Sequence, residues 1–491
     1  MALEDFEEYN RKTYKFNINV EFDTHIDLTE RIVKVSEAFG LGVNERKKFT
    51  IFKDFKIGFS AGDVVFITGD SGGGKSILLK ELKSKLTEVY DMNDFQPDKS
   101  ERVIEGIGKD LDEAIKLLSV VGLNDAFIFL RKYGELSDGQ KYRYRLAKIF
   151  QSNPKFVFID EFCANLDRTT AKVIAYNLQR IARKTGTVLF CATTHTDIRD
   201  DLNPSVLVEK RFMDEVKINY YPYEKKRISF YDDVTVEEGT MRDYEKLAKY
   251  HYKNTGTNFP YTKIVAMKYK NELAGVAVMS PPFLQTKGRT IKFAKKYSLM
   301  TKPIVAEINK FFIRGSRYII SPKFRACGLG QKLAYDTMMF VPEKRYIEVV
   351  TVMGQYNPVF ERIGMEKIEI SEESDGPTIK LYNWLEQKGL KIDEVHNPRY
   401  LRGFIEALTI SDKTNLKFMM GKVMHHPKLG LSSKDGRRAE VVAQEKRYIE
   451  VPFEEVHNEI LSHLPKLYSG STFYYIMKNP FYTGEEEKVW F

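Results

Sequence analysis

Short apolar runs mark the strands in the first half of this chain. The runs at 64–68, at 156–159 and just before His195 contain no alternating polar residues. A strand that is apolar on both faces is typical of the centre of a parallel sheet covered by helices. A polar turn and a basic amphipathic helix lie between the first two runs, at 134–150. The pattern therefore predicts an α/β domain with a parallel sheet.

The pattern changes in the second half of the chain. The segments 272–282, 317–321 and 346–353 again read as strands, and a glycine-containing loop and a helix follow the second of them. Towards the end, apolar residues recur at helical spacing, as in 453–468. We therefore expect four parts: an N-terminal extension over 1–33, a nucleotide domain over 34–222, a second α/β domain over 228–370, and a mostly helical accessory region over 371–491.

Composition indicates the cellular compartment and shows one basic region. A chain of 491 residues, 43% hydrophobic and 30% charged, is too long for a single core. Its acidic start and the lack of a long apolar run argue against a signal peptide and a membrane span. Three scattered cysteines suit a reducing compartment. We expect a cytoplasmic protein with no membrane association, whose net charge of +9 arises mainly within 228–370.

A phosphate-binding loop, GDSGGGKS, follows the strand at 64–68 directly. It fits G-x-x-x-x-G-K-S between a strand and a helix. The candidate nucleotide-binding residues are Gly69, Ser71, Gly72, Gly73, Gly74, Lys75 and Ser76. Backbone N–H groups of such a loop surround the phosphates, the lysine reaches the terminal phosphates, and the serine hydroxyl binds Mg²⁺. The loop predicts ATP or GTP binding with Mg²⁺.

Two acids follow the buried strand at 156–159, and they are Asp160 and Glu161. Acids at the carboxyl end of a central parallel strand face the nucleotide crevice. Asp160 is the candidate ligand of Mg²⁺, and Glu161 can position the water that attacks the terminal phosphate.

These pieces together resemble the ABC-type ATPases over roughly residues 34–222. The stretch LSDGQ is similar to the family signature, which begins LSGGQ, with one Asp substitution. The matching residues are Gln96 for the Q-loop that contacts Mg²⁺, Ser137, Gly139 and Gln140 for the signature, Asp167 for the D-loop and His195 for the switch histidine. In that family the signature of one subunit faces the phosphate loop of another. The resemblance therefore implies a homodimer with ATP sandwiched between the two chains.

A second glycine loop lies in SPKFRACGLGQKLAYDTM. Arg325, Gly328 and Gly330 stand between a strand and the start of a helix, where backbone N–H groups point towards an anion. No Lys-Ser or Lys-Thr pair follows, so this loop is not a second ATP loop.

The second loop resembles motif A of the GNAT acetyltransferases, in which (Gln/Arg)-x-x-Gly-x-(Gly/Ala) binds the pyrophosphate of acetyl-CoA. The stretches ELAGVAVMSPP and YNPVFERIGMEKI are similar to the central hairpin strand and the closing motif of that family. The expected order is strand, glycine loop, helix, strand, helix and strand. The match spans about 228–370 and implies acetyl-CoA or another acyl-CoA as the second cofactor.

The GNAT resemblance also implies roles for individual residues. Backbone amides of the strand with Tyr318 and Ile320 would polarise the thioester, and Asn357 belongs to the closing motif. The tyrosine that often serves as the acid is absent, because Phe360 occupies its position. Tyr356 and Tyr335 are the substitute acids, and Glu307 is a candidate base whose alternative role is a salt bridge to a neighbouring lysine.

The combination of both resemblances is similar to a family of ABC-type ATPases fused to a GNAT domain. The basic stretch 287–317 interleaves lysines and arginines with aromatic residues, which is typical of nucleic-acid binding. Its candidate contacts are Lys292, Lys295 and Lys296. A solvated face, or charge that meets the cofactor, is the alternative interpretation of this stretch.

Three functions remain open at this point. The first is an ATP-gated acyltransferase that modifies a DNA or RNA base. The second is a protein or small-amine N-acetyltransferase regulated by the ATPase. The third is a non-catalytic ATPase that binds nucleic acid and senses CoA.

Overall fold

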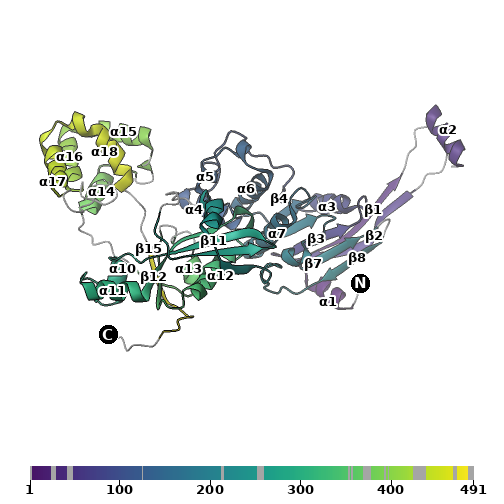
Figure 1. Ribbon diagram of the computed structural model, residues 1–491. Helices are drawn as coiled ribbons and strands as arrows, with labels where there is room; N and C mark the ends of the chain where they lie inside the picture. Colours follow the sequence, from purple (N-terminus) through teal and green to yellow (C-terminus); the bar gives the residue numbers. More distant parts are fainter. Residues whose placement is uncertain are drawn as a thin grey trace.

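The fold was obtained as a computed structural model (Figure 1). The structure describes residues 3–23, 29–40, 48–123, 125–211, 215–250, 259–351, 354, 358–368, 377–391, 394–395, 397–423, 438–467 and 473–484. In these residues, no helix is long and apolar enough to cross a membrane.

The first half of the chain forms a six-stranded sheet in the order β4-β5-β6-β3-β7-β8. The strands are β3 (Val64–Gly69), β4 (Val89–Asp91), β5 (Phe156–Ile159), β6 (Val188–Ala192), β7 (Val206–Lys210) and β8 (Val216–Tyr220). All neighbours are parallel except β7 and β8. The predicted parallel α/β sheet is confirmed, and β3, β5 and β6 are buried along their length as their unbroken apolar runs require, apart from a partly exposed Gly69.

Helices pack on this sheet and extend beyond it. They are α3 (Lys75–Ser84), α4 (Leu111–Val120), α5 (Ala126–Phe129), the 3₁₀ turn η1 (Tyr133–Glu135), α6 (Asp138–Gln151), α7 (Arg168–Thr185) and α8 (Arg199–Leu202). One core joins α4, α6 and α7 to one face of the sheet, and a second core joins α3 to the other.

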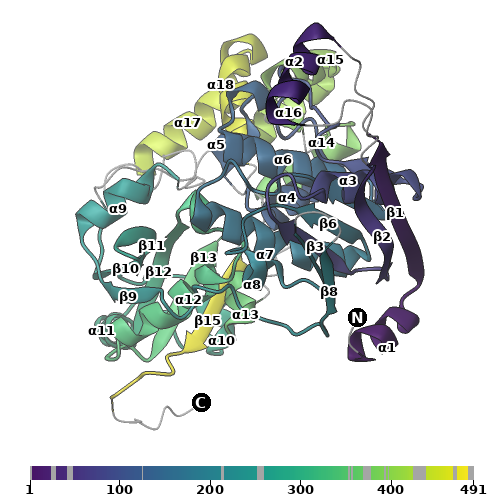
Figure 2. The ribbon, with the colours of Figure 1, turned by 90° about the vertical axis from the view of Figure 1, so that its right-hand side faces the viewer.

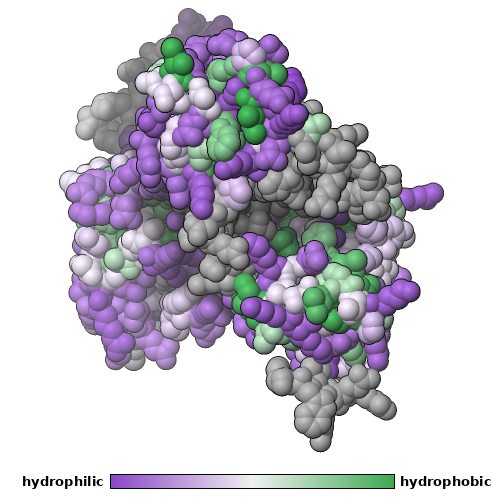
Figure 3. All heavy atoms as spheres, turned by 90° about the vertical axis from the view of Figure 1, so that its left-hand side faces the viewer, coloured by the Kyte–Doolittle hydropathy of each residue, from purple (hydrophilic) through white to green (hydrophobic). Residues whose placement is uncertain are grey.

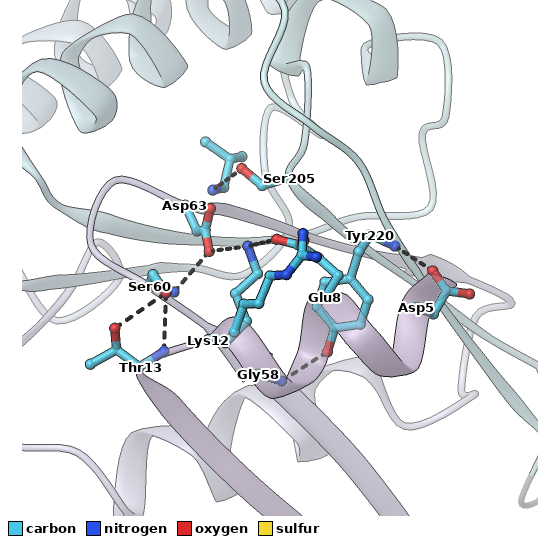
Figure 4. Close-up of polar contacts among 11 residues, drawn as sticks. Asp5, Glu8, Lys12, Thr13, Gly58, Ser60, Asp63, Ser205 and Tyr220 are labelled. Carbon is cyan, nitrogen blue, oxygen red and sulfur yellow. Dashed lines mark hydrogen bonds and ion pairs between the residues drawn. The ribbon is translucent and has the colours of Figure 1, made fainter. Parts of the chain in front are cut away.

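The N-terminal residues belong to this domain, so the predicted boundary at residue 33 is wrong. Strand β1 (Tyr14–Asp23) pairs with β2 (Lys48–Phe59), and helix α2 (Glu30–Phe39) lies at the far end of this hairpin (Figure 1). Helix α1 (Leu3–Arg11) is tied to the sheet through Asp5, which accepts a hydrogen bond from the Tyr220 amide, and through an ion pair between Lys12 and Asp63 (Figure 4). A sequence boundary could not show these contacts, because the partners lie up to 215 residues away.

A seven-stranded mixed sheet follows, in the order β14-β15-β13-β12-β11-β10-β9. Its strands are β9 (Thr235–Glu238), β10 (Lys263–Tyr269), β11 (Glu272–Ser280), β12 (Phe312–Ile320), β13 (Tyr346–Thr351), β14 (Glu366–Ile368) and β15 (Phe473–Lys478). Only β12 and β13 are parallel neighbours. The accompanying helices are α9 (Met241–Ala248), α10 (Lys287–Lys292), α11 (Lys302–Phe311), η2 (Pro322–Phe324), α12 (Leu329–Asp336), η3 (Thr337–Phe340) and α13 (Val359–Arg362).

The predicted accessory region over 371–491 needs a correction at its end. Strand β15 inserts between β13 and β14 and so completes the second sheet. The helices before it have a core of their own, and they are α14 (Pro377–Gln387), α15 (Pro398–Ala407), α16 (Ile410–Val423), α17 (Arg438–Glu450) and α18 (Phe453–Leu467). The helical region is therefore an insertion into the second domain and not a tail.

Helix α7 lies between the two sheets, as Figures 1 and 2 both show. Its Val173 shares a core with Phe230 of the connecting segment and with Phe324, Cys327 and Leu333 of the second domain. The two domains therefore share a continuous apolar core at the second glycine loop.

Candidate functional site

The first glycine loop has the backbone geometry of a phosphate cradle. Gly74 is the N-cap of α3 at φ 101°, and no side chain caps the free N–H groups of that helix. A Cβ atom at Gly69, where φ is 130°, would lie 1.8 Å from the Lys210 carbonyl oxygen. Only glycine fits there, so the chain can turn tightly at the end of β3. Ser71, Gly72 and Ser76 are exposed, and Gly73 is buried.

Lys75 lies across this loop. Its Nζ atom donates to the carbonyl oxygens of Gly69 at 3.0 Å and Asp70 at 2.7 Å. Burial lowers the Lys75 pKa, and the opposing charges of Asp160 and Asp70 only partly offset that effect. The Lys75 ammonium group is hydrogen-bonded to carbonyl oxygens, and it can donate to phosphate oxygens instead when a nucleotide binds. The uncapped N-terminus of α3 and this lysine are suited to binding the phosphates of a nucleoside triphosphate.

The predicted chemistry residues gather at the carboxyl ends of neighbouring strands. Asp160 and Glu161 follow β5, and His195 follows the adjacent β6, which lies beside β3. Gln96 is exposed and follows β4, the neighbour of β5. Glu161 has a left-handed φ of 50° and an exposed side chain, which turns it out of the strand. Ser76, Gln96 and Asp160 carry side-chain oxygen atoms, the ligand type that Mg²⁺ prefers, and they stay the predicted ligands of Mg²⁺.

The signature residues sit at the start of α6. Ser137 caps the helix and forms a capping box with Gln140, and the Ser137 side chain remains exposed. Gly139 packs beside Leu166 and Thr170, next to the D-loop. Asp167 caps α7 by accepting from the Thr170 amide at 3.1 Å and lies 3.3 Å from Lys323. Burial alone would raise the Asp167 pKa, but the Thr170 hydrogen bonds and Lys323 outweigh it and lower that pKa.

The second glycine loop also opens a helix. Gly328 is the N-cap of α12 at φ 94° and has no side-chain cap, while Gly330 follows in the first turn. The loop therefore presents backbone N–H groups to an anion. The Arg325 side chain does not, because it is 6% exposed and its Nε atom donates to the Ile320 carbonyl oxygen at 2.9 Å. Burial lowers the Arg325 pKa, with Asp125 opposing. Any anion contact at this position would be through its backbone.

Strand β12 is bulged and half open beside that loop. Arg317 opposes Val278 on β11, and Gly315 opposes Met279, so Ser316 is an extra residue. The parallel pairing with β13 covers only Phe312 to Gly315. Within the described strands, the β13 edge of β12 is therefore unpaired around Tyr318 and Ile320. Backbone groups on such an edge can bind an extended ligand.

Of three further transferase candidates, only Glu307 lies within the described residues. Tyr356 and Asn357 lie outside the described residues. Glu307 pairs with Lys296 at 2.6 Å and accepts from the Tyr297 hydroxyl at 2.8 Å, which is the salt bridge predicted as its alternative role. Its role as a base stays a prediction.

The three lysines proposed for nucleic acid lie at the surface. Lys292 pairs with Glu366, and Lys296 pairs with Glu307. Lys295 adopts a left-handed φ of 65° in the turn after α10. Two of the three charges are thus partly balanced within the protein.

Sequence reasoning missed the contacts that hold the second loop. Arg143, which is 4% exposed on α6, donates to the Pro322 carbonyl oxygen at 2.9 Å. Arg180 of α7 donates to the Ala326 carbonyl oxygen at 3.4 Å. Burial lowers the Arg143 pKa to about 10. Because the acceptors are backbone carbonyls more than 140 residues away, no residue pattern could have revealed these pairs.

Comparisons with known proteins support the first domain alone. No family model matches the chain. It is 27% identical over 193 residues to the lipoprotein-releasing system ATP-binding protein LolD 1 of Rhodopirellula baltica, covering 31% of this chain and 83% of that protein. It is 26% identical over 226 residues to the ribosome protection protein VmlR of Bacillus subtilis, covering 42% of this chain and 36% of that protein. It is 35% identical over 89 residues to the phosphonates import ATP-binding protein PhnC of Hydrogenovibrio crunogenus, covering 18% of this chain and 32% of that protein.

The chain thus spans about a third of the length of VmlR and PhnC. Among solved structures, cbiO1 of Clostridium perfringens aligns with a TM-score of 0.29 and 20% identity, over 34% of this chain and 81% of that one. This chain carries an ABC-type ATPase domain, for which ATP and Mg²⁺ are the expected ligands.

Proposed function

We propose that the chain is an ATP-gated acyltransferase that uses acyl-CoA and acts on nucleic acid. In this proposal the first domain forms an ATP-sandwich homodimer, and the second domain is a GNAT-type transferase. The observation that carries it is the bulged, half-open strand β12 leading directly into an uncapped glycine loop.

The order of elements supports acyl-CoA as the second ligand. Strand β12, the glycine loop, α12, β13, α13 and β14 follow one another in the order expected from the GNAT resemblance. The Gly328 loop would hold the pyrophosphate, and the open edge near Tyr318 would hold the thioester arm. Transfer would break the C–S bond and join the acyl carbon to an acceptor amine, with the amine proton passing to the thiol.

Direct contacts between the domains support gating by ATP. The signature helix holds the second loop through Arg143, and the D-loop acid Asp167 lies 3.3 Å from Lys323, which immediately precedes Phe324 in that loop. In an ATP sandwich, the signature and D-loop meet the partner's nucleotide. Closing or opening that dimer would therefore move residues that touch the second loop.

The exposed serine of the signature supports the dimer. Ser137 faces solvent at the start of α6, where it is free to meet a nucleotide on another chain. Glu161 and His195 would act on the water and the terminal phosphate within each composite site.

Radiolabelled acetyl-CoA tests the proposal. We expect label to enter single-stranded DNA or RNA in the presence of ATP, and we expect Gly328→Glu to abolish that transfer while ATP turnover continues. Label in a protein or small amine alone would favour the N-acetyltransferase alternative. CoA binding without transfer to any acceptor would favour the sensing alternative.

A further inference from the structure

The loop that carries His195 is fixed at both ends by the core of the first domain. On the β6 side, the Thr193 amide donates to the Ile67 carbonyl oxygen at 3.1 Å, and the Thr193 hydroxyl accepts from the His195 amide at 3.3 Å. On the other side, Ile198 is fully buried in that core. Within the described residues the His195 ring makes no hydrogen bond, so the backbone of this loop determines where the ring lies.

Arg168 attaches the same loop to the first turn of α7. Its Nε atom donates to Asp197 Oδ2 at 2.9 Å, and its Nη2 atom donates to Asp197 Oδ1 at 2.5 Å. A pair joined by two parallel hydrogen bonds is fixed in orientation as well as in distance. The hydrogen bonds from Arg168 outweigh burial and lower the pKa of Asp197. The pair therefore ties an 18-residue helix to a position two residues after His195.

The pair is too exposed to serve mainly for stability. Hydrophilic side chains are spread over the face drawn in Figure 3, so an ion pair at the surface is an ordinary feature of this protein. The Arg168 and Asp197 side chains are 38% and 43% exposed, and pairs of this kind contribute little to the free energy of unfolding. The Arg168 Nη1 atom is also buried without a hydrogen-bond partner among the described residues, which costs stability. What distinguishes the pair is its place, directly after the D-loop acid Asp167 and beside the switch histidine.

We propose that Arg168 is a positioning residue for ATP hydrolysis, which holds the loop of His195 at a fixed place relative to the D-loop. A catalytic group contributes fully only when its surroundings hold it in the productive geometry. The preceding residue, Asp167, lies 3.3 Å from Lys323 of the second domain, so movement of that domain would reach His195 through Arg168. The proposal rests on the roles that the proposed function gives to His195 and the D-loop.

Steady-state turnover of Mg-ATP by the full-length chain tests this role. Arg168→Met keeps an apolar side chain and removes the guanidinium group. We expect kcat to fall about tenfold to a hundredfold, the scale that a misplacement of about 1 Å can cause, with little change in KM because the phosphate loop is intact. Arg168→Lys keeps the charge without the two parallel hydrogen bonds and should have an intermediate kcat. Because the pair is partly exposed, both variants should unfold close to the native temperature.

Two double variants show whether Arg168 acts through the residues named here. Arg168→Met combined with Asp197→Asn should lose no more turnover than Arg168→Met alone, because both changes remove the same contact. Arg168→Met combined with His195→Ala should be no slower than His195→Ala alone. Lys155→Met is the matched control, since it removes an ion pair with Glu88 just before the amino ends of β5 and β4, and it should turn over ATP like the native chain.

Each outcome decides for or against the role of Arg168. Native kcat in Arg168→Met, with or without a lower unfolding temperature, overturns it, and so does a full further loss when Arg168→Met is added to His195→Ala. Native turnover in His195→Ala would contradict both the proposed role of His195 and this one. ATP turnover requires neither CoA nor nucleic acid. If no label reaches any acceptor from acetyl-CoA while Arg168→Met still lowers kcat, the acyltransferase proposal fails and the role of Arg168 stands.

Discussion

The two glycine loops of this chain differ most in what surrounds them. The first follows the carboxyl end of the central strand β3, and its Ser71 and Gly72 are exposed. The second has no exposed residue between 321 and 330, and Arg143 and Arg180 hold its carbonyl oxygens from the ATPase side. Both use the same local device, a glycine N-cap with positive φ at the start of a helix.

The difference indicates which loop can control the other. The first loop is open to solvent at Ser71 and Gly72, so its ligand can enter and leave directly. A loop held by another domain changes shape when that domain moves. If the proposed dimer closes on ATP, we expect free energy to pass from the ATP site to the second loop through α6 and α7, and by linkage a ligand on the second loop would act back on that closure.

The largest expected effect comes from Glu161→Gln. The variant should bind ATP and lose about 10²–10⁴-fold in turnover, because the group that we propose to orient or deprotonate the attacking water is gone. Gel filtration with ATP should show a stable dimer. Glu105→Gln, at an exposed acid of the same domain, should behave like the native chain. A Glu161→Gln chain that stays monomeric with ATP would contradict the composite site.

A glutamate substituted into each glycine loop should show which loop binds ATP and which binds CoA. Gly72→Glu has open space around its Cβ and should lose ATP binding while CoA binding persists. Gly328→Glu, whose nearest neighbour is Tyr231 at 3.9 Å, should lose CoA binding and keep ATP turnover. Each carboxylate meets phosphate with like charge. Affinity should fall more than a hundredfold, as measured by calorimetry with each ligand.

Both glycines have positive φ, so both variants carry the same backbone strain, and circular dichroism and thermal unfolding check that each is folded. Gly403→Glu, on the helical insertion with no atom within 4 Å of its Cβ, is a control for added charge. Unchanged CoA affinity in Gly328→Glu would show that the second loop is not a phosphate cradle.

Local chemistry was predictable from the sequence, and distant pairing was not. The loop at 69–76 and the acids 160–161 were found because each lies within one strand and the turn that follows it. Strand β15 was missed because its sheet neighbours are Tyr346 and Glu366, more than 100 residues earlier, with a helical insertion between. The role of Arg143 was hidden in the same way, since a basic amphipathic helix ordinarily turns its arginines to solvent.

Arg143→Met tests the connection between the loops. Removal of the guanidinium leaves the Pro322 and Lys323 carbonyl oxygens without these donors and should cost about 1–3 kcal/mol of the free energy of unfolding. We expect ATP to shift CoA affinity in the native chain by about fivefold to a hundredfold, typical of coupled sites, and not in this variant. Calorimetry of CoA with and without ATP measures both. Arg180→Gln, at a longer and exposed contact, should weaken the coupling less. Full coupling in Arg143→Met would place the connection elsewhere.

Neutralising the surface lysines should have a smaller effect. Lys292→Gln, Lys295→Gln and Lys296→Gln together should lower the salt dependence of nucleic-acid binding by about 0.9 log units per lost phosphate contact on duplex and about 0.7 on single strands. The internal ion pairs of Lys292 and Lys296 reduce what each contributes. Filter binding across a salt series measures the slope, with Lys99→Gln and Lys109→Gln on the ATPase as the control pair. An unchanged slope would move nucleic acid away from this surface.

The smallest effect concerns Lys323, which joins the domains at the surface by pairing with Asp167 and Glu272. Because Lys323 and Asp167 are 26% and 56% exposed, Lys323→Gln should lower the free energy of unfolding by less than about 1 kcal/mol at neutral pH.

The lowered Asp167 pKa stabilises the fold above the unfolded value of about 3.9, and that contribution is lost as pH falls through the folded pKa. Burial alone would lower the Lys323 pKa, but the hydrogen bonds to Glu272 and Asp167 outweigh it and raise that pKa. The stability that Lys323 contributes is therefore lost as pH rises above about 10.4 and through the folded pKa. Urea unfolding should therefore show the native chain and the variant converging at both extremes. A difference that persists after pH has fallen through the folded Asp167 pKa would mean that Lys323 acts through packing and not through its charge.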